Sequence, residues 1–364
     1  PGRSADSTEE RTLTETATQP NPMPPRTDPQ PQRMPHRMDI HGLRGLGIVL
    51  VVAYHLWSNG RVSGGVDIFL IISAYLMTAS MVRKGKTFRI MTFLIQRFRR
   101  LVPQAAIVIA ATLAFGWFFL PPTRQPTLLH HAWSSLFYYE NWTLIDQAVN
   151  YTAVDPGGVS PFQHFWSLSI QGQVFVVWPV LFIGCLALAT LFRAHLKLVL
   201  TIAFSTITIA SFVFAQFDIA NDRAAAYFNT FGRVWEFSLA ALLALIPRMT
   251  MPRAVAIPLG WAGLAAVLAT GFLVGRAPFP GPAALLPALG AAAIMIGDLR
   301  ADDRRDVAYW LSRRPVTFVA NRAYGLYLWH WPVYAYFMAL TATPALGLGV
   351  GGSIFVLGLS LLLA

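Results

Sequence analysis

Long apolar segments separated by short polar ones make up most of the chain. A membrane-crossing helix needs about 20 predominantly apolar residues, and segments close to that length begin at residue 40 and continue to the end of the sequence. The pattern predicts ten such helices, at residues 40–57, 66–82, 102–120, 165–190, 196–217, 228–246, 254–274, 283–298, 316–340 and 346–364. We therefore expect an all-α protein, a polytopic membrane helical bundle with about ten transmembrane helices.

The segment before the first apolar run has a different composition. Residues 1–38 are rich in Pro, Thr, Gln and Glu and have no apolar period, so they cannot bury enough surface to offset the entropy of the chain. They also lack the charged region followed by an apolar region that is typical of a cleaved signal peptide. We expect a disordered tail, followed by a first helix that stays in the membrane as an anchor.

Residues 128–145 are ambiguous, because two histidines and a glutamate interrupt an otherwise apolar segment. They fit either an eleventh crossing or a helix at the membrane surface. Lys and Arg concentrate in cytoplasmic loops, and this rule separates the two topologies. If residues 128–145 do not cross and the N-terminus is cytoplasmic, the inner loops hold sixteen basic residues and the outer loops four. We therefore expect ten crossings, both ends inside, and an outer loop at about 121–164.

Composition agrees with a membrane protein. The 364 residues are 55% hydrophobic and 12% charged, with a mean hydropathy of +0.50, whereas soluble domains have about 25% charged residues. The net charge of +11 is mostly loop charge that sets orientation, so it does not indicate a nucleic-acid partner. The single cysteine, Cys185, excludes an internal disulfide and offers no metal cluster.

Three ionisable residues stand out in the first two apolar segments. Arg44 and His55 are eleven residues apart, which is about 16 Å along a helix and nearly the same face. The second helix runs back after a Gly-containing turn, so we expect Asp67 near its start to come close to His55. A histidine oriented by a carboxylate is a candidate general base. The alternative is a histidine that only caps the outer end of the first helix.

Two further groups of polar residues lie within apolar segments. Arg233 and Glu236 are spaced for an ion pair on one helix face, which favours a structural role, with a substrate contact as the alternative. Tyr324, Tyr327 and His330 recur every third residue and form a polar stripe. Lining of a cavity and packing in a core with satisfied hydroxyls remain equally open for this stripe.

Arg97, Arg99 and Arg100 form a basic cluster at the start of the third apolar segment. Such a cluster holds the headgroups of the inner leaflet, but arginine is also suited to bidentate phosphate binding. Both interpretations remain open, and the second would suit a cytoplasmic cofactor with several phosphates.

Six motifs between residues 39 and 345, in this order, resemble the acyltransferase-three family of integral-membrane O-acyltransferases. They are Arg44 and His55 with ten residues between them, Gly65-Val-Asp67-Ile-Phe, Arg97-Phe-Arg-Arg-Leu-Val-Pro103, His164-Phe-Trp-Ser-Leu, Arg233-Val-Trp-Glu236 and Tyr324-Gly-Leu-Tyr-Leu-Trp-His-Trp-Pro332.

The resemblance implies a ten-helix domain in the bacterial inner membrane that takes an acyl group, usually acetyl, from cytoplasmic acyl-coenzyme A. The group is delivered to a hydroxyl of an envelope glycan or glycolipid on the outer side. His55 would act as general base or carry the acyl group, with Asp67 as its partner and Arg44 shaping the acyl path. Arg97, Arg99 and Arg100 would bind the coenzyme A phosphates, and no metal is implied. The remaining candidate substrate contacts are His164, Trp166, Gln171, Arg233, Glu236, Tyr327 and His330.

The chain departs from the family pattern at Gln171, where relatives often have a glutamate. An amide donates and accepts hydrogen bonds but carries no charge and shuttles no proton. If that glutamate is an acid or base, catalysis here depends on His55 and Asp67. If it is an acceptor contact, Gln171 is a tolerable substitute. We also expect the last helix, residues 346–364, to be truncated before a further domain.

Two rival functions fit the same residues. A glycolipid transporter or flippase would use the buried charges for proton coupling and would be independent of acyl-coenzyme A. A scaffold that has lost catalysis would not be stabilised by a coenzyme A thioester.

Overall fold

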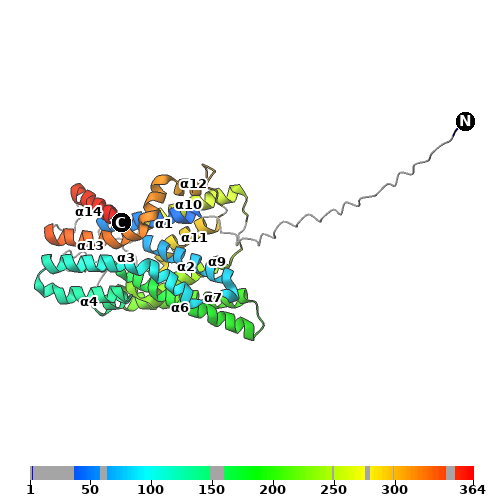
Figure 1. Ribbon diagram of the computed structural model, residues 1–364, viewed down its shortest axis with the longest axis horizontal. Coiled ribbons are helices and arrows are strands. Elements are labelled where there is room, and N and C mark those ends of the chain that lie inside the picture. The colour runs from blue at the N-terminus through cyan, green and yellow to red at the C-terminus, as the bar shows by residue number, and fades with distance from the viewer. Residues whose placement is uncertain are drawn as a thin grey trace. The chain divides into compact units, whose positions relative to one another are not determined.

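Helices account for all the regular structure in the described residues, which are 2, 37–57, 64–147, 160–247, 250–274, 279–297, 299–341 and 349–364 of a computed structural model. Residues from Arg37 onward form one helical unit (Figure 1). The predicted disordered tail, residues 1–38, lies almost wholly outside the described residues, and the first helix begins at Met38.

Each of the ten predicted apolar segments is a helix. These helices are α1 Met38–Trp57, α2 Gly65–Lys84, α3 Ile90–Phe119, α6 Phe165–Leu191, α7 Leu196–Asn221, α9 Thr230–Leu245, α10 Arg253–Leu273, α11 Leu285–Ile296, α13 Arg314–Thr341 and α14 Val350–Leu363. In the described part of the chain, six of them (α1, α2, α3, α6, α7 and α10) are long and apolar enough to cross a membrane, and α11 and α14 are shorter apolar helices. The polytopic all-α bundle is therefore confirmed.

Residues 128–145 do not form one continuous helix. They contribute to two short helices, α4 Gln125–Leu136 and α5 Glu140–Asp146, which are separated by a break at Tyr138, where φ is 60°. α4 returns alongside α3, and α5 packs on α6 (Figure 1). His131 and Glu140 are buried and pair with each other, with His131 Nδ1 2.6 Å from Glu140 Oε1, whereas His130 is exposed.

The short helices α8 Arg223–Phe228 and α12 Val307–Leu311 complete the α-helical elements among the described residues. Helix α1 lies against α2, α11, α12 and α13, while α9 packs on α2 and α7. α1 and α13 run parallel and in register, because Arg44 lies beside Ala320 at one level and His55 beside His330 at another. This pairing joins residues about 275 positions apart in the sequence.

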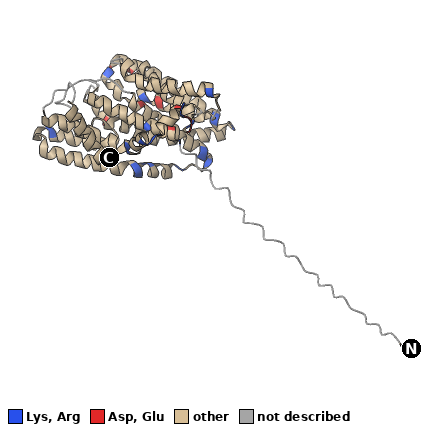
Figure 2. Cartoon of the chain, turned by 90° about the horizontal axis from the view of Figure 1, so that it is seen from above, with Lys and Arg blue, Asp and Glu red and all other residues tan. Residues whose placement is uncertain are grey.

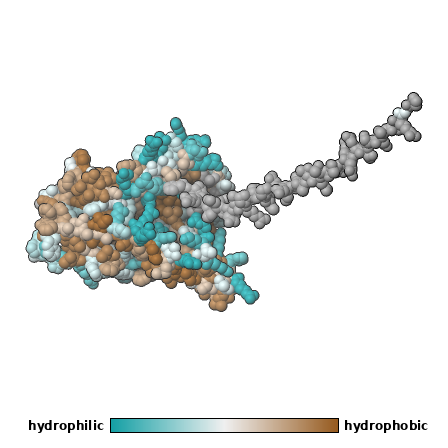
Figure 3. Space-filling model, in the orientation of Figure 1, coloured by the Kyte–Doolittle hydropathy of each residue, from teal (hydrophilic) through white to brown (hydrophobic). Residues whose placement is uncertain are grey.

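Large apolar side chains cover much of the outside of the bundle. Phe118 is 81% exposed, Phe272 76% and Leu362 81%, and the face over α3, α4, α13 and α14 is mostly hydrophobic in Figure 3. In Figure 2 most basic residues lie toward the edges of the bundle, whereas several acidic residues lie within it. An apolar surface of this extent fits burial in lipid rather than contact with water.

Helices α10 and α11 approach through facing glycines. A Cβ added to Gly263 would lie 2.7 Å from the carbonyl oxygen of Gly290, and one added to Gly290 would lie 2.8 Å from that of Gly263. Small residues allow such close backbone contact, which drives helix association in membranes.

We expect Gly263→Ala to lower the thermal stability of the detergent-solubilised protein by about 1–3 kcal/mol, because a backbone oxygen has to move. Gly184→Ala is the matched control, since a Cβ there meets nothing within 4 Å and alanine favours the helix by about 1 kcal/mol. Equal stability of the two variants in a thermal unfolding assay would contradict the close-packing interpretation.

Candidate active site

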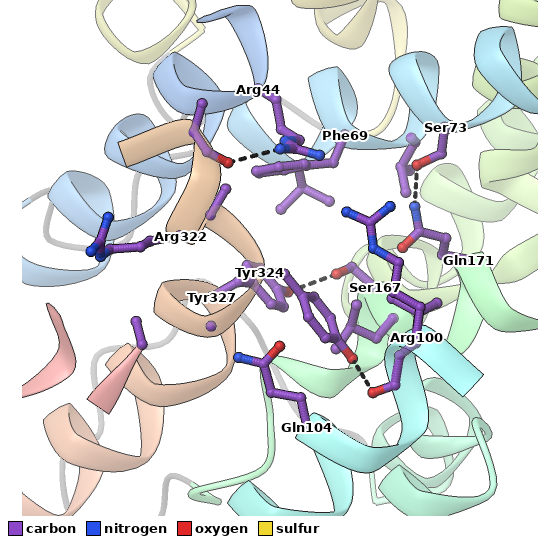
Figure 4. Close-up of a pocket in the computed structure, with 18 of the residues that line it drawn as sticks. Arg44, Phe69, Ser73, Arg100, Gln104, Ser167, Gln171, Arg322, Tyr324 and Tyr327 are labelled. Atoms are coloured by element: carbon purple, nitrogen blue, oxygen red, sulfur yellow. Dashed lines mark hydrogen bonds between the residues drawn. The ribbon is translucent and has the colours of Figure 1, made fainter. Parts of the chain in front are cut away.

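A cavity of 310 Å³ opens between α1, α2, α3, α6 and α13 (Figure 4). Its walls combine apolar residues such as Val66, Phe69 and Phe175 with a large polar set. The polar lining residues are Arg44, Ser73, Arg97, Arg100, Gln104, Ser167, Gln171, Asn321, Arg322, Tyr324 and Tyr327. No aspartate or glutamate is among the residues that line it, so the cavity carries a large positive charge.

The arginines come from three helices. Arg44 on α1 donates to the carbonyl oxygen of Ala320 at 2.8 Å, and its Nε is buried with no hydrogen-bond partner in the described structure. Arg97 on α3 lies over the rings of Phe93 and Phe175, at 5.4 and 4.8 Å. The charge of Arg100 acts unfavourably on both Arg44 and Arg97. An anion in the cavity would relieve this repulsion.

Arg97 and Arg100 line the cavity, whereas Arg99 does not, so phosphate binding by Arg99 remains a prediction. The reason is helix geometry. α3 begins at Ile90, well before the predicted apolar segment, so all three arginines lie within a helix. Residues three apart share a face of a helix, whereas a residue two positions on points away. Arg97 and Arg100 therefore face the cavity together.

Arg322 and Tyr324 extend the cavity on the α13 side. Arg322 stacks on the ring of Phe318, 3.9 Å from its centroid, and the Tyr324 hydroxyl donates to the carbonyl oxygen of Leu101 at 2.9 Å. Arg322 was not among the site residues predicted from the sequence. Its position two residues before Tyr324, at the start of the polar stripe, was the available signal.

Gln171 faces the cavity and donates to the hydroxyl of Ser73 (Figure 4). At the position where the family resemblance predicts a glutamate, the cavity is thus lined by a neutral side chain. Gln173 lies two residues further along α6 and points to the other side of the helix. Its amide donates to Tyr138 O and Asn141 Oδ1, both at 2.9 Å.

Tyr327 closes the inner end of the cavity. Its hydroxyl donates to the carbonyl oxygen of His164 at 2.7 Å and accepts from Ser167 Oγ, also at 2.7 Å. Because a phenol has a single proton, these two bonds fix the direction of both. Behind Tyr327 lie His164, 5.4 Å between ring centroids, and His330, 5.6 Å.

His55, His164 and His330 form a histidine cluster beyond the cavity. His55 Nδ1 lies 2.8 Å from His330 Nε2, and the rings of His164 and His330 are 5.7 Å apart. His164 is 1% exposed, and neither of its ring nitrogens has a hydrogen-bond partner in the described structure. None of the three is among the residues that line the cavity. His164 and His330 lie next to Tyr327, and His55 contacts His330.

The expected pairing of Asp67 with His55 is wrong. The Asp67 carboxylate accepts from Arg233 Nη1 at 3.0 Å. The cause is the level at which α2 starts, because Gly65 abuts Gly47 and Val51 of α1, one to two helical turns short of His55. Along the axis of α1, Asp67 therefore lies closer to the Arg44 end of the helix than His55 does.

Arg233, Asp67 and Glu236 form a fully buried ion cluster. Arg233 Nη1 also donates to Glu236 Oε1 at 3.0 Å, which confirms the ion pair predicted from their spacing. The guanidinium lies over the rings of Trp166, Tyr227 and Phe279 at 5.3, 4.9 and 5.0 Å. These residues do not line the cavity, so substrate contacts for Arg233, Glu236 and Trp166 remain predictions.

The fold and the site define a class of protein: a helical membrane domain in which an arginine-lined pocket adjoins a cluster of histidines. A family model described as an acyltransferase domain matches residues 38–364. The chain belongs to this acyltransferase family.

Three relatives show the extent of the similarity. The chain is 30% identical over 314 residues to the peptidoglycan O-acetyltransferase OatA of Listeria monocytogenes, covering 81% of this chain and 49% of that one. It is 31% identical over 306 residues to BcsY of Komagataeibacter xylinus, covering 81% of this chain and 72% of BcsY. It is 29% identical over 318 residues to YrhL of Bacillus subtilis, covering 81% of this chain and 48% of YrhL. The chain spans about half the length of OatA and YrhL, and no solved structure matches it.

Changing single members of the buried ion cluster should affect stability to very different extents. Arg233→Gln leaves two carboxylates without a counter-charge and should cost about 3–5 kcal/mol of stability. Glu236→Gln leaves one carboxylate with one guanidinium and should change stability by only about 1 kcal/mol. Thermal unfolding in detergent measures both, and a loss in Glu236→Gln as large as that in Arg233→Gln would contradict the charge balance.

Proposed function

We propose that this protein is a membrane O-acyltransferase that moves an acyl group, acetyl in the first instance, from cytoplasmic acyl-coenzyme A to a hydroxyl of an envelope glycan or glycolipid on the outer side. The observation that carries the proposal is the arginine-lined cavity whose inner end, at Tyr327, adjoins the histidine cluster. The positive-inside distribution of basic loops supports a cavity that opens to the cytoplasm.

The donor fits the chemistry of the cavity. Arg97, Arg100 and Arg44 supply guanidinium groups that bind phosphate oxygens in a planar, bidentate manner. Coenzyme A carries several phosphates at one end and the thioester at the other. With the phosphates at Arg97 and Arg100, the thioester would extend toward Ser167 and Tyr327 and pass Tyr327 to meet His55.

The chemistry assigned to His55 is general-base catalysis. Its ring takes the proton of the acceptor hydroxyl while the hydroxyl oxygen attacks the thioester carbonyl carbon. A carbon–oxygen bond forms, the carbon–sulfur bond breaks, and His55 returns the proton to the sulfur of the departing coenzyme A. Charge balance in this scheme needs no metal and no carboxylate at the base.

The acceptor is proposed from chemistry and from the relatives. OatA is described as a peptidoglycan O-acetyltransferase, so a sugar hydroxyl of an envelope polymer is the first acceptor to test, and a glycolipid is the second. Asp67 and Glu236, two buried carboxylates that the transporter alternative would use for proton coupling, are already paired with Arg233. Acyl transfer is therefore the favoured function.

Protein reconstituted in liposomes should transfer label from radiolabelled acetyl-coenzyme A to extracted envelope glycans or lipids. His55→Ala should lower the rate by about 10²–10⁴-fold, because the base is lost, while exposed His195→Ala serves as the control. Full transfer by a folded His55→Ala variant would refute the mechanism. Glycolipid movement without acetyl-coenzyme A would favour the transporter.

The three neighbouring arginines provide a matched test of donor binding. Arg97→Ala and Arg100→Ala should each raise the KM for acetyl-coenzyme A by roughly 10–100-fold, since a hydrogen bond to a charged group contributes about 1.5–3 kcal/mol. Arg99→Ala removes the same charge from the other helix face and should leave KM within about 2-fold of the unsubstituted value. Equal effects at all three positions would indicate a general interaction with headgroups.

A further inference from the structure

A hairpin of two short helices packs behind the cavity. α4 runs back along α3 (Figure 1), and the chain then turns at Tyr138 into α5, which packs on α6. The turn lies beside the first third of α3, since the rings of Tyr138 and Phe98 meet edge to face with 5.6 Å between centroids. Part of the segment expected as an outer loop, residues 121–164, therefore reaches the helix that carries Arg97 and Arg100.

Polar contacts within the hairpin join its two helices. The buried Glu140 carboxylate of α5 accepts a hydrogen bond from Ser134 Oγ and lies 2.6 Å from His131 Nδ1, and both of these partners belong to α4. The backbone closes the turn as well, because the N–H of Tyr139 donates to the carbonyl oxygen of Ser134 at 2.9 Å. Tyr138 is thus carried at the tip of a hairpin whose two arms are fixed to each other.

α6 turns one face to this hairpin and another to the cavity. The hydroxyl of Ser169 accepts from the backbone N–H of Glu140 at 3.1 Å, and the amide of Gln173 donates to the carbonyl oxygen of Tyr138 at 2.9 Å. Gln171 lies two positions from each of these α6 residues and lines the cavity. Residues two positions apart on a helix are rotated by about 200°, so the hairpin holds α6 by the face opposite Gln171.

Gly172 lies between these two anchor points and leaves room for the Tyr138 ring. A Cβ added to Gly172 would lie 2.3 Å from Cδ1 and 2.8 Å from Cγ of Tyr138. Tyr138 adopts the left-handed backbone region, with φ of 60°, which is uncommon for a residue other than glycine. The conformation of the turn therefore places the ring in the space that the glycine leaves.

The Tyr138 ring contacts two of the helices that line the cavity, α3 through Phe98 and α6 through Gly172. The same two helices also meet where the Arg97 guanidinium lies over the Phe175 ring, 4.8 Å from its centroid. Contact with the hairpin and contact with each other together set the position of α3 relative to α6.

We propose that Tyr138 is a positioning residue for the donor site, because its ring spaces α3 from α6 and so sets the distance of Arg97 and Arg100 from Gln171. The identity of the donor, a coenzyme A thioester, rests on the proposed function. Hydrogen bonds from guanidinium groups to phosphate weaken steeply when their angles change, so a shift of α3 against α6 lowers the affinity for the donor. The hairpin thus belongs to the donor site, although none of the residues that line the cavity comes from it.

Binding of coenzyme A to the protein in lipid nanodiscs, measured by isothermal titration calorimetry, tests this role without turnover. Tyr138→Ala should raise the Kd by about 10-fold, the loss expected for one misaligned hydrogen bond between charged groups. Tyr138→Phe keeps the ring and should leave the Kd within about 2-fold of the unsubstituted value. Phe137→Ala is the matched control, because this neighbouring ring is 55% exposed. An unchanged Kd in Tyr138→Ala, or equal losses in Tyr138→Ala and Tyr138→Phe, would overturn the proposal.

Gly172→Ala tests the same contact from α6 and leaves the hairpin sequence unchanged. The added methyl group meets the Tyr138 ring, so the Kd for coenzyme A should rise by about 3–10-fold. In the Tyr138→Ala background the ring is gone, and the same substitution should change the Kd by less than about 2-fold, because effects of residues in direct contact do not add. Full additivity, or an unchanged Kd in Gly172→Ala alone, would contradict the spacing role.

The outcomes also distinguish this proposal from the function beneath it. If the unsubstituted protein binds no coenzyme A, the proposed donor is refuted, and the proposed function with it. If it binds coenzyme A with the same Kd in all the variants, only the role of Tyr138 is refuted. Because Gly172→Ala keeps the ring and the hairpin intact, its result decides the question even where Tyr138→Ala fails to fold.

Discussion

The constraint that shapes this structure is the cost of placing charge in an apolar interior. Arg233 is fully buried, and it is tolerable there because two carboxylates and three aromatic faces surround it. The pairing joins α2 to α9, and Trp166 brings α6 to the same point. This interaction also removes Asp67 from the chemistry of the site, so the base has to find its partner elsewhere.

The remaining ionisable groups divide by location. Those around the cavity are cationic and unbalanced, as expected of a site that takes an anion. In the histidine cluster, His55 contacts His330, and His330 contacts backbone carbonyl oxygens. Tyr327 belongs to both regions, since its hydroxyl faces the cavity and its carbonyl oxygen holds His330. The proposed separation of donor binding from proton transfer follows from this division.

Apolar periodicity predicted every one of the ten apolar helices, because the requirement to bury backbone polar groups in lipid leaves few other structures. It did not predict the fold-back of α4 and α5, which depends on the pairing of His131 with Glu140. Within the site, helical spacing alone would have separated Arg99 from Arg97 and Arg100. The partners of His55 and Asp67 could not be predicted, since they depend on the level at which α2 meets α1 and on α13, far away in the sequence.

Because α1 and α13 run parallel and in register, the spacing along the helices between the two contacts that join them is fixed. Arg44 and His55 are eleven positions apart, and their neighbours on the other helix, Ala320 and His330, are ten positions apart. One residue inserted between the two contacts on either helix would turn the far side chain by about 100° and break one contact while keeping the other. Insertions and deletions that preserve the site are therefore confined to the loops and helix ends. As the sequence of such a domain diverges, the number of residues between these two contacts has to stay the same.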